Sequence, residues 1–152
     1  MDSITKLSFT LKIRGYISLL KLRLSSLVVM SAFFGFLLAD GNLTSYIFLN
    51  LILGGVLITG SSNGFNQIIE YKTDELMSRT FSRPLPSKVL SIPEALIFCI
   101  ITGVLGLYLL ASINFSSFIL GLLAMVIYTV IYTPLKKITP FAVFVGAIPG
   151  SI

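Results

Sequence analysis

The polar run Asn66-Gln67-Ile68-Ile69-Glu70-Tyr71-Lys72-Thr73-Asp74 interrupts a chain that is otherwise strongly apolar, and polar residues continue from it to Pro86. Asn66, Glu70 and Asp74 follow one another at intervals of four residues. Residues at this spacing share one face of an α-helix, so we expect one amide and two carboxylates to line that face over two turns. Proteins hold Mg²⁺ through one or two such carboxylates together with substrate phosphates.

Two arginines follow this face within a short distance, at Arg79 and Arg83, and a Pro-rich exit comes after them. Arginine pairs with phosphate through two parallel hydrogen bonds. Oxygen ligands on one helix face with guanidinium groups beside them therefore predict a site for a diphosphate held by a hard cation.

The composition is that of an integral membrane protein. Of the 152 residues, 55% are hydrophobic and 11% are charged, against about 25% charged in soluble domains. The net charge is +5, but the basic residues do not form a basic face interleaved with polar surface. This argues against nucleic-acid binding. The chain has no histidine, which excludes zinc and His-based acid–base chemistry within it, and its single cysteine, Cys99, is expected to pack as a small apolar residue.

We expect an all-α, polytopic membrane bundle that forms one domain over residues 1–152. Its apolar segments lie at about 17–39, 43–69, 95–113, 115–132 and 141–152. A signal peptide is the alternative for the first segment, but the apolar run is too long and no clear cleavage site follows it. The last segment is too short to cross a bilayer, so we expect the chain to be the N-terminal part of a larger bundle.

The basic residues indicate the orientation of the segments. All eleven lie before or early in the first segment, after the second segment, or after the fourth. By the positive-inside rule the N-terminus and both polar loops are cytoplasmic, or on the matrix side in an organelle. The Ser91-Ile92-Pro93-Glu94 run is a capping-box pattern, so Glu94 is expected to cap a helix rather than bind a ligand.

The polar run resembles the first aspartate-rich motif of the UbiA-type intramembrane prenyltransferases. Its continuation, Arg79-Thr80-Phe81-Ser82-Arg83-Pro84-Leu85, is similar to the haem-farnesylating branch, protoheme IX farnesyltransferase or haem O synthase. Two later runs resemble the same branch: Tyr132-Thr133-Pro134-Leu135-Lys136-Lys137-Ile138-Thr139-Pro140-Phe141 and Val145-Gly146-Ala147-Ile148-Pro149-Gly150. Lys21-Leu22-Arg23-Leu24 is a weaker match.

The resemblance implies a bundle of nine transmembrane helices, of which about 4.5 are present, around a central cavity. It also implies Mg²⁺-dependent transfer of a farnesyl group from farnesyl diphosphate to a vinyl group of haem B, giving haem O. By likeness, the catalytic and Mg²⁺-binding residues would be Asn66, Glu70 and Asp74, and the diphosphate-binding residues would be Arg79, Arg83, Lys136 and Tyr132. The implied location is the bacterial plasma (inner) membrane, with the mitochondrial inner membrane as the alternative.

Three departures from the family pattern limit these implications. Glu70 stands where the wider superfamily mostly has Asp, and Leu22 stands where the branch usually has Pro, which weakens any role for Arg23. The second aspartate-rich motif of the family lies in a C-terminal half that is missing here, so we expect these 152 residues to be inactive alone.

Other functions are compatible with parts of the pattern. A quinone or other aromatic prenyltransferase of the same superfamily is one, although the run Arg79–Pro86 speaks against it. A transporter or channel fragment could use Glu70 and Asp74 for ions, and a purely structural or assembly role is a third possibility. Protection of the motif by diphosphate would separate a prenyltransferase from a transporter, which has no use for arginines at this spacing.

Overall fold

The computed structural model describes residues 2–151, with side chains from residue 9 onward, and all regular secondary structure in this range is helical. The helices are α1 (Asp2–Leu20), α2 (Leu22–Leu38), α3 (Tyr46–Leu76), α4 (Ile92–Ala111), α5 (Phe115–Val126), the π-helix η1 (Ile127–Tyr132), α6 (Thr133–Leu135) and α7 (Ala142–Ser151). The predicted all-α fold is confirmed. Helices α5, η1 and α6 run on from one another as a single rod over Phe115–Leu135.

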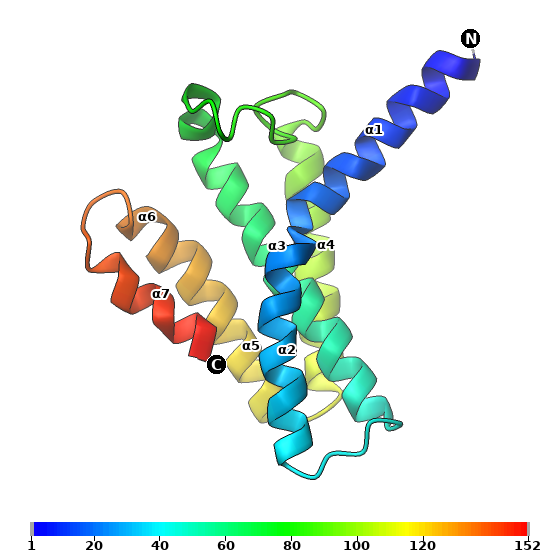
Figure 1. Cartoon of the computed structure of the whole chain (residues 1–152), viewed down its shortest axis with the longest axis vertical. Helices are drawn as coiled ribbons and strands as arrows, with labels where there is room; N and C mark the ends of the chain where they lie inside the picture. Colours follow the sequence, from blue (N-terminus) through cyan, green and yellow to red (C-terminus); the bar gives the residue numbers. More distant parts are fainter. Residues whose placement is uncertain (1, 152) are drawn as a thin grey trace.

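Three helices are long and apolar enough to cross a membrane: α3, α4 and the Phe115–Leu135 rod. A fourth span results if α1 and α2, which meet at a bend of 42°, cross together. The chain is therefore an integral membrane protein. Figure 1 shows α3 and α4 side by side in the middle of the bundle, α2 in front of them and the rod with α7 beside them.

The N-terminal apolar segment differs from the single helix expected over 17–39. The helix breaks at Lys21, whose backbone is left-handed (φ 45°, ψ 54°). Two carbonyls that the break frees find side-chain donors: Gln67 Nε2 lies 3.1 Å from the Leu19 oxygen, and Ser25 Oγ lies 2.8 Å from the Leu20 oxygen. Since buried carbonyls need partners, these contacts stabilise the break even though no proline is present.

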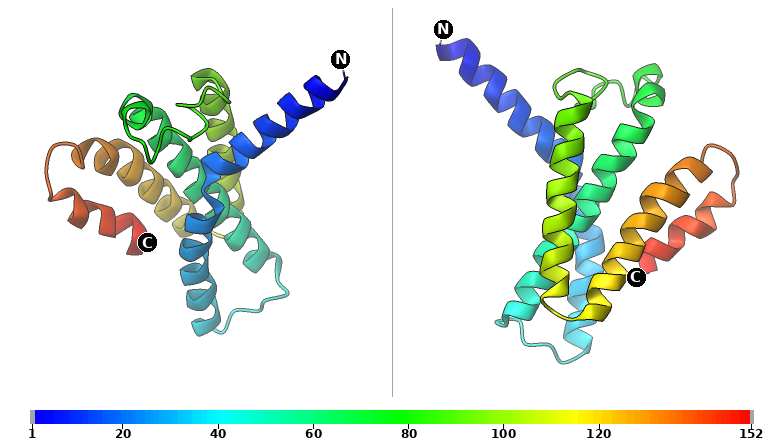
Figure 2. Two further views of the ribbon diagram at one scale, coloured as in Figure 1. Left: turned by 45° about the horizontal axis from the view of Figure 1, so that its top comes forward. Right: turned by 180° about the vertical axis from the view of Figure 1, so that it is seen from behind.

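Helix α3 is the centre of the bundle and contacts α1, α2, α4, α5 and η1. Its closest neighbour is α4, as the view from behind in Figure 2 shows. A Cβ atom added to Gly54 would lie 3.2 Å from the Gly106 oxygen, and one added to Gly106 would lie 3.1 Å from the Gly54 oxygen. Ser61 Oγ donates to the Cys99 carbonyl at 2.7 Å, and the buried Cys99 packs there as predicted. Small residues thus let the two helices approach closely, as is usual in membranes.

The length of α3 decides where the polar run lies. Its 31 residues span about 46 Å at 1.5 Å per residue, while the hydrocarbon core is about 30 Å thick. The last turns, which carry Asn66, Glu70 and Asp74, therefore reach the membrane surface. Figure 1 places the loop 77–91 and the end of α6 toward that same end, and the turns at 39–45 and 112–114 at the opposite end.

The N-terminus of α4 is fixed as the sequence predicts. The Ser91 side chain accepts from the Glu94 backbone, and the Glu94 carboxylate accepts from the Ser91 backbone, which completes the capping box. Glu94 also pairs with Lys12 of α1 at 2.5 Å, a contact that the sequence did not indicate. This half-exposed pair connects α1 to the start of α4.

The α3–α4 contact yields a test with a matched control. Gly106→Ala places a methyl group 3.0 Å from the Ile58 nitrogen, so we expect it to destabilise the protein by about 1–3 kcal/mol through overpacking. Gly35→Ala, also in a helix, meets no atom within 4 Å and should be neutral or slightly stabilising. Thermal unfolding of the two variants in detergent measures the difference. Equal melting temperatures would contradict the close contact.

Candidate active site

The face of α3 predicted from the spacing carries a hydrogen-bonded pair. Asn66 Nδ2 donates to Glu70 Oε2 at 3.0 Å, one turn further along α3. Asn66 is 2% exposed, and Asp74, another turn along, is 4% exposed. A carboxylate buried to this degree is stable only with a cation or several donors beside it.

The cation beside Glu70 comes from the end of the rod. Lys136 Nζ lies 3.0 Å from Glu70 Oε2 and 3.0 Å from Asn66 Oδ1. The same ammonium group lies 5.4 Å from the centre of the Tyr132 ring, within range of a cation–π contact. Lys136, Tyr132, Asn66 and Glu70 therefore form one cluster, although about seventy residues separate its two halves.

The π-helix η1 brings the rod into register with α3. Thr133, which is fully buried, places Oγ1 2.8 Å from the Tyr128 carbonyl five residues earlier and 3.0 Å from Asn66 Oδ1. Tyr128 and Tyr132 stack with ring centres 5.3 Å apart. Short π-helical turns inside longer helices are frequent at functional sites. Gly146 of α7 makes room for this turn, because a Cβ there would lie 2.7 Å from the Tyr132 ring.

The loop 77–91 supplies the cation for the second carboxylate. Arg83 Nη1 pairs with Asp74 Oδ2 at 2.5 Å, and the Asp74 side chain is 6% exposed. Thr80 Oγ1 donates to the Asp74 carbonyl at 3.0 Å, which folds the loop back over the end of α3. Arg79 is exposed, and its side chain has no hydrogen bond or ion pair with the described residues.

Below the polar cluster lies an apolar cavity of about 200 Å³ between α2, α3, α5 and α7. Asn63 and Tyr128 form its polar end, with the Tyr128 hydroxyl 3.5 Å from Asn63 Oδ1. The rest of its lining is mainly apolar: Leu24, Val28, Ile58, Thr59, Ser62, Ala124, Met125, Gly146, Pro149 and Gly150. A second cavity of about 450 Å³ shares part of this lining and extends the space along the bundle.

The donor atoms suit a hard cation that shares its coordination with a substrate. Among the described residues, no group of three or more His, Cys, Asp or Glu side chains could hold a metal ion unaided. The available ligands are the Asn66 amide oxygen and the carboxylates of Glu70 and Asp74. Asn66 and Glu70 already face Lys136, and Asp74 faces Arg83. A positive charge is therefore stable beside each carboxylate. An all-oxygen set completed by phosphate is the arrangement that Mg²⁺ prefers.

The structure brings together most, but not all, of the predicted site residues. Asn66, Glu70, Lys136 and Tyr132 share one cluster, Asp74 and Arg83 form a pair nearby, and Arg79 stands apart. Sequence reasoning gave no site role to Thr133, Asn63 or Lys21, although Thr133 and Lys21 lie in runs that resemble the family. Asn63 could have been found, because it lies one turn before Asn66 on α3.

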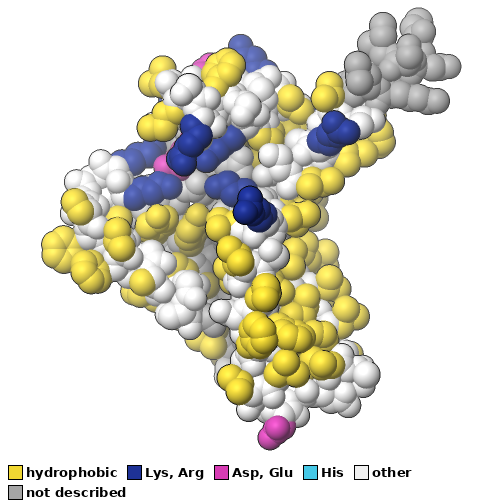
Figure 3. Space-filling model, in the orientation of Figure 1, with side chains coloured by type: hydrophobic (Ala, Val, Ile, Leu, Met, Phe, Trp, Pro, Cys, Tyr) yellow, Lys and Arg dark blue, Asp and Glu magenta, His cyan; other side chains and the backbone are white. Residues whose placement is uncertain are grey.

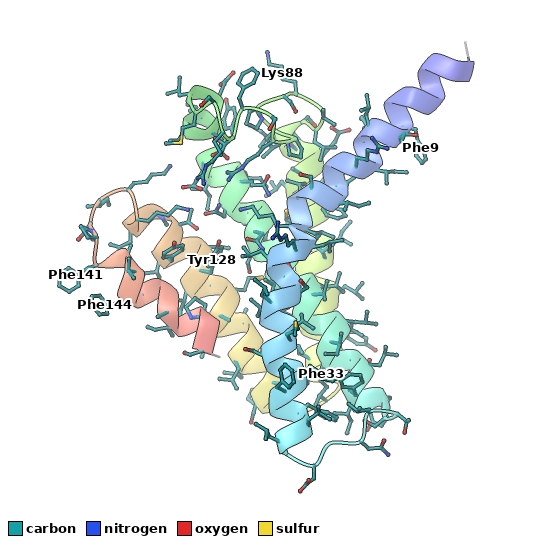
Figure 4. The ribbon with its side chains drawn as sticks, viewed as in Figure 1. Phe9, Phe33, Lys88, Tyr128, Phe141 and Phe144 are labelled. Carbon is teal, nitrogen blue, oxygen red and sulfur yellow. The ribbon has the colours of Figure 1, made fainter. Side chains whose placement is uncertain are left out.

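Lys21, at the α1–α2 break, belongs to the electrostatic surroundings of the site. Its charge interacts with those of Glu70, Asp74, Arg83 and Lys136. Figure 3 shows Lys and Arg side chains gathered around one hollow on this face, while the lower half of the face is mostly hydrophobic. Figure 4 shows Tyr128 on the rod at this level, with Phe141 and Phe144 of the outer segment pointing away from the bundle.

Comparisons with known proteins show to which family the chain is similar. The model of the UbiA prenyltransferase family matches residues 28–152. Proteins named protoheme IX farnesyltransferase are similar: one from Cytophaga hutchinsonii is 43% identical over 140 residues, which cover 91% of this chain and 49% of that protein. One from Christiangramia forsetii is 43% identical over 132 residues (87% and 44%). The Arabidopsis thaliana mitochondrial protein is 40% identical over 143 residues (91% and 33%).

The chain thus spans about half the length, or less, of these relatives. No solved structure is significantly similar to the chain.

The Asp74–Arg83 pair gives a prediction about stability. Arg83→Met leaves the buried Asp74 carboxylate unpaired and should cost about 2 kcal/mol, at the low end for such pairs because Arg83 is partly exposed. Asp74→Asn should cost less, since the Arg83 side chain is 24% exposed and can reach water. The double variant should be more stable than Arg83→Met alone. A double-mutant cycle from denaturation in detergent checks this, and strictly additive losses would contradict a coupled pair.

Proposed function

The chain belongs to the UbiA prenyltransferase family, and from this premise we propose that the whole protein transfers a farnesyl group from farnesyl diphosphate to haem B. The product would be haem O. One observation supports the proposal most directly. Two carboxylate–cation pairs, Glu70 with Lys136 and Asp74 with Arg83, lie at the end of α3 above an apolar cavity. The names of the relatives supply the donor and acceptor classes.

In this proposal the polar cluster binds the diphosphate and the apolar cavity receives the prenyl chain. Mg²⁺, when bound to Asn66, Glu70 and Asp74, would neutralise charge on the diphosphate and help it to leave. Lys136 and Arg83, which pair with the carboxylates in this structure, would bind diphosphate oxygens. Exposed Arg79 could reach the same anion from the loop 77–91.

The reaction breaks the bond between C1 of the farnesyl group and the diphosphate oxygen, and the electron pair leaves with the diphosphate. The π electrons of the vinyl group then form the new carbon–carbon bond to C1, which leaves a cation on the vinyl carbon next to the porphyrin ring. A water molecule adds to this cation and loses a proton, which gives the hydroxyl group of the product. Lys136 and Arg83 stabilise the charge that develops on the leaving group. Tyr128, on which Tyr132 stacks, lines the cavity that would hold the allylic cation, and the apolar lining keeps bulk water from it.

The basic residues support a proposed orientation in the membrane. Lys and Arg side chains gather around the end of the bundle that carries the cluster, so we assign this end to the cytoplasmic side of a bacterial plasma membrane. Farnesyl diphosphate would then enter from the cytoplasm, with its chain in the bilayer region. We assign the activity to the whole protein and expect no turnover from these 152 residues alone.

Two adjacent lysines provide the test of this proposal. Lys136→Met removes the ammonium group shared by Asn66 and Glu70, and we expect the transfer rate to fall at least about a hundredfold. Lys137→Met is the matched control, because Lys137 is exposed and its side chain has no partner among the described residues. The assay follows haem O formation by the whole protein, with Mg²⁺ and with EDTA.

Equal rates for the two variants, or full activity in EDTA, would contradict the proposed site. If prenyl transfer occurs to an aromatic quinone precursor but not to haem B, the site stands and the acceptor is wrong. If no prenyl diphosphate is consumed at all, a non-catalytic membrane role is the better interpretation.

A further inference from the structure

The break between α1 and α2 is built from buried contacts rather than from a helix-breaking residue. In an uninterrupted helix the Leu20 carbonyl would accept from the nitrogen of Leu24. Instead, the nitrogens of Leu24 and Ser25 both donate to the Lys21 carbonyl, at 2.8 and 3.0 Å. The freed Leu19 and Leu20 carbonyls are taken by the Gln67 and Ser25 side chains.

Gln67 of the polar run contacts the α1–α2 break. It is 2% exposed, lies next to Asn66 on α3, and donates to the Leu19 carbonyl from the side of α3 that faces α1. The same amide nitrogen also lies 3.5 Å from the Asn63 carbonyl one turn earlier on α3, so one NH2 group contacts both helices. Leu19 itself is fully buried in a cluster with Leu85, Leu90 and Ala95. The break is therefore fastened to the helix that carries the site.

The residue at the break, Lys21, has a strained backbone conformation. Lys21 is left-handed (φ 45°), a conformation that costs a non-glycine residue energy and that occurs often at functional sites. Its side chain is only partly buried, and its charge interacts with Glu70, Asp74, Arg83 and Lys136 together. Glu70 and Asp74 each have a cation already, so Lys21 is an additional positive charge beside a site that is otherwise balanced.

We propose that Lys21 is a further cation for the diphosphate, on an element other than the loop 77–91 and the rod, and that Gln67 is the positioning residue that holds the helix break in the shape that presents it. This inference rests on the proposed function. A diphosphate carries more negative charge than one Mg²⁺ neutralises, and the carboxylates of Glu70 and Asp74 offset the charge of Lys136 and Arg83. A further cation on a third element balances the loaded site. Removing the hydrogen bond from Gln67 to the Leu19 carbonyl would therefore weaken diphosphate binding only because it displaces Lys21.

The test measures binding of radiolabelled inorganic diphosphate to the whole protein in detergent with Mg²⁺, by equilibrium dialysis. Lys21→Met should weaken binding about tenfold or more, as expected for one charged hydrogen-bond donor. Lys12→Met is the matched control, since this lysine lies on α1, the helix before the break, but pairs with Glu94, and it should bind normally. Gln67→Leu should weaken binding severalfold, and the double variant Gln67→Leu with Lys21→Met should bind no worse than Lys21→Met alone.

A chemical rescue separates positioning from a general loss of stability. Lys21→Cys should bind weakly and recover when aminoethyl methanethiosulfonate restores a positive charge at that thiol, while a sulfonate reagent should not restore binding. The only cysteine of this chain, Cys99, is buried, and the unsubstituted protein treated in the same way controls for others. In a Gln67→Leu background the rescue should recover binding no further than the level of Gln67→Leu alone. Thr102→Val, which also removes a buried hydroxyl contact, should change stability without changing binding.

Each outcome decides the proposal. Normal diphosphate binding by Lys21→Met would overturn it, and so would losses from Gln67→Leu and Lys21→Met that simply add. If Lys21→Met weakens only the binding of haem B, the lysine serves a carboxylate of the acceptor instead and the proposal is wrong. If the unsubstituted protein binds no diphosphate, the proposed function itself is wrong. If it binds diphosphate and Lys21→Met binds equally well, only the proposal about Lys21 is wrong.

Discussion

A carboxylate buried in a membrane protein is stable only beside a positive charge, and this constraint arranges the polar end of the bundle. Glu70 and Asp74 are 13% and 6% exposed at their side chains, and each has one cation within hydrogen-bonding distance. Neither cation belongs to α3. Lys136 follows α6 and Arg83 lies in the loop 77–91, so the two pairs fasten two separate segments to the end of α3.

These pairs depend on how closely the neighbouring helices approach α3. Gly54 and Gly106 let α4 lie against one side, which fixes where the loop 77–91 returns. On the other side, the π-helical turn at Ile127–Tyr132 changes the register of the rod, so that Thr133 and Lys136 both face Asn66. A regular α-helix could not bring the Thr133 hydroxyl to a carbonyl five residues earlier in the same way. The irregular turn is thus part of the site.

The sequence predicted the features that depend on periodicity and composition. The all-α fold, the Asn66–Glu70–Asp74 face and the Ser91–Glu94 cap each follow from local spacing, and the structure contains them. The break at Lys21 was not predicted, because it depends on a contact between Gln67 and a carbonyl 48 residues away. The π-helix was missed for a similar reason. The pattern of the run Ile127–Tyr132 predicts an ordinary apolar α-helix, and its π-helical form depends on packing against α3 and Gly146.

The distribution of cations over different elements has a consequence for how such a site works. Acceptor oxygens all stand on α3, which is rigid and central, whereas donors come from the loop 77–91, from the end of the rod and, in the proposal above, from the α1–α2 break. An anion that drew these donors to itself would join three segments that otherwise touch α3 separately. Part of its binding energy would be spent on ordering them and on closing the cavity to water. The donors would be in place only when the substrate is, which protects a reactive allylic cation better than a permanently open pocket of the same charge.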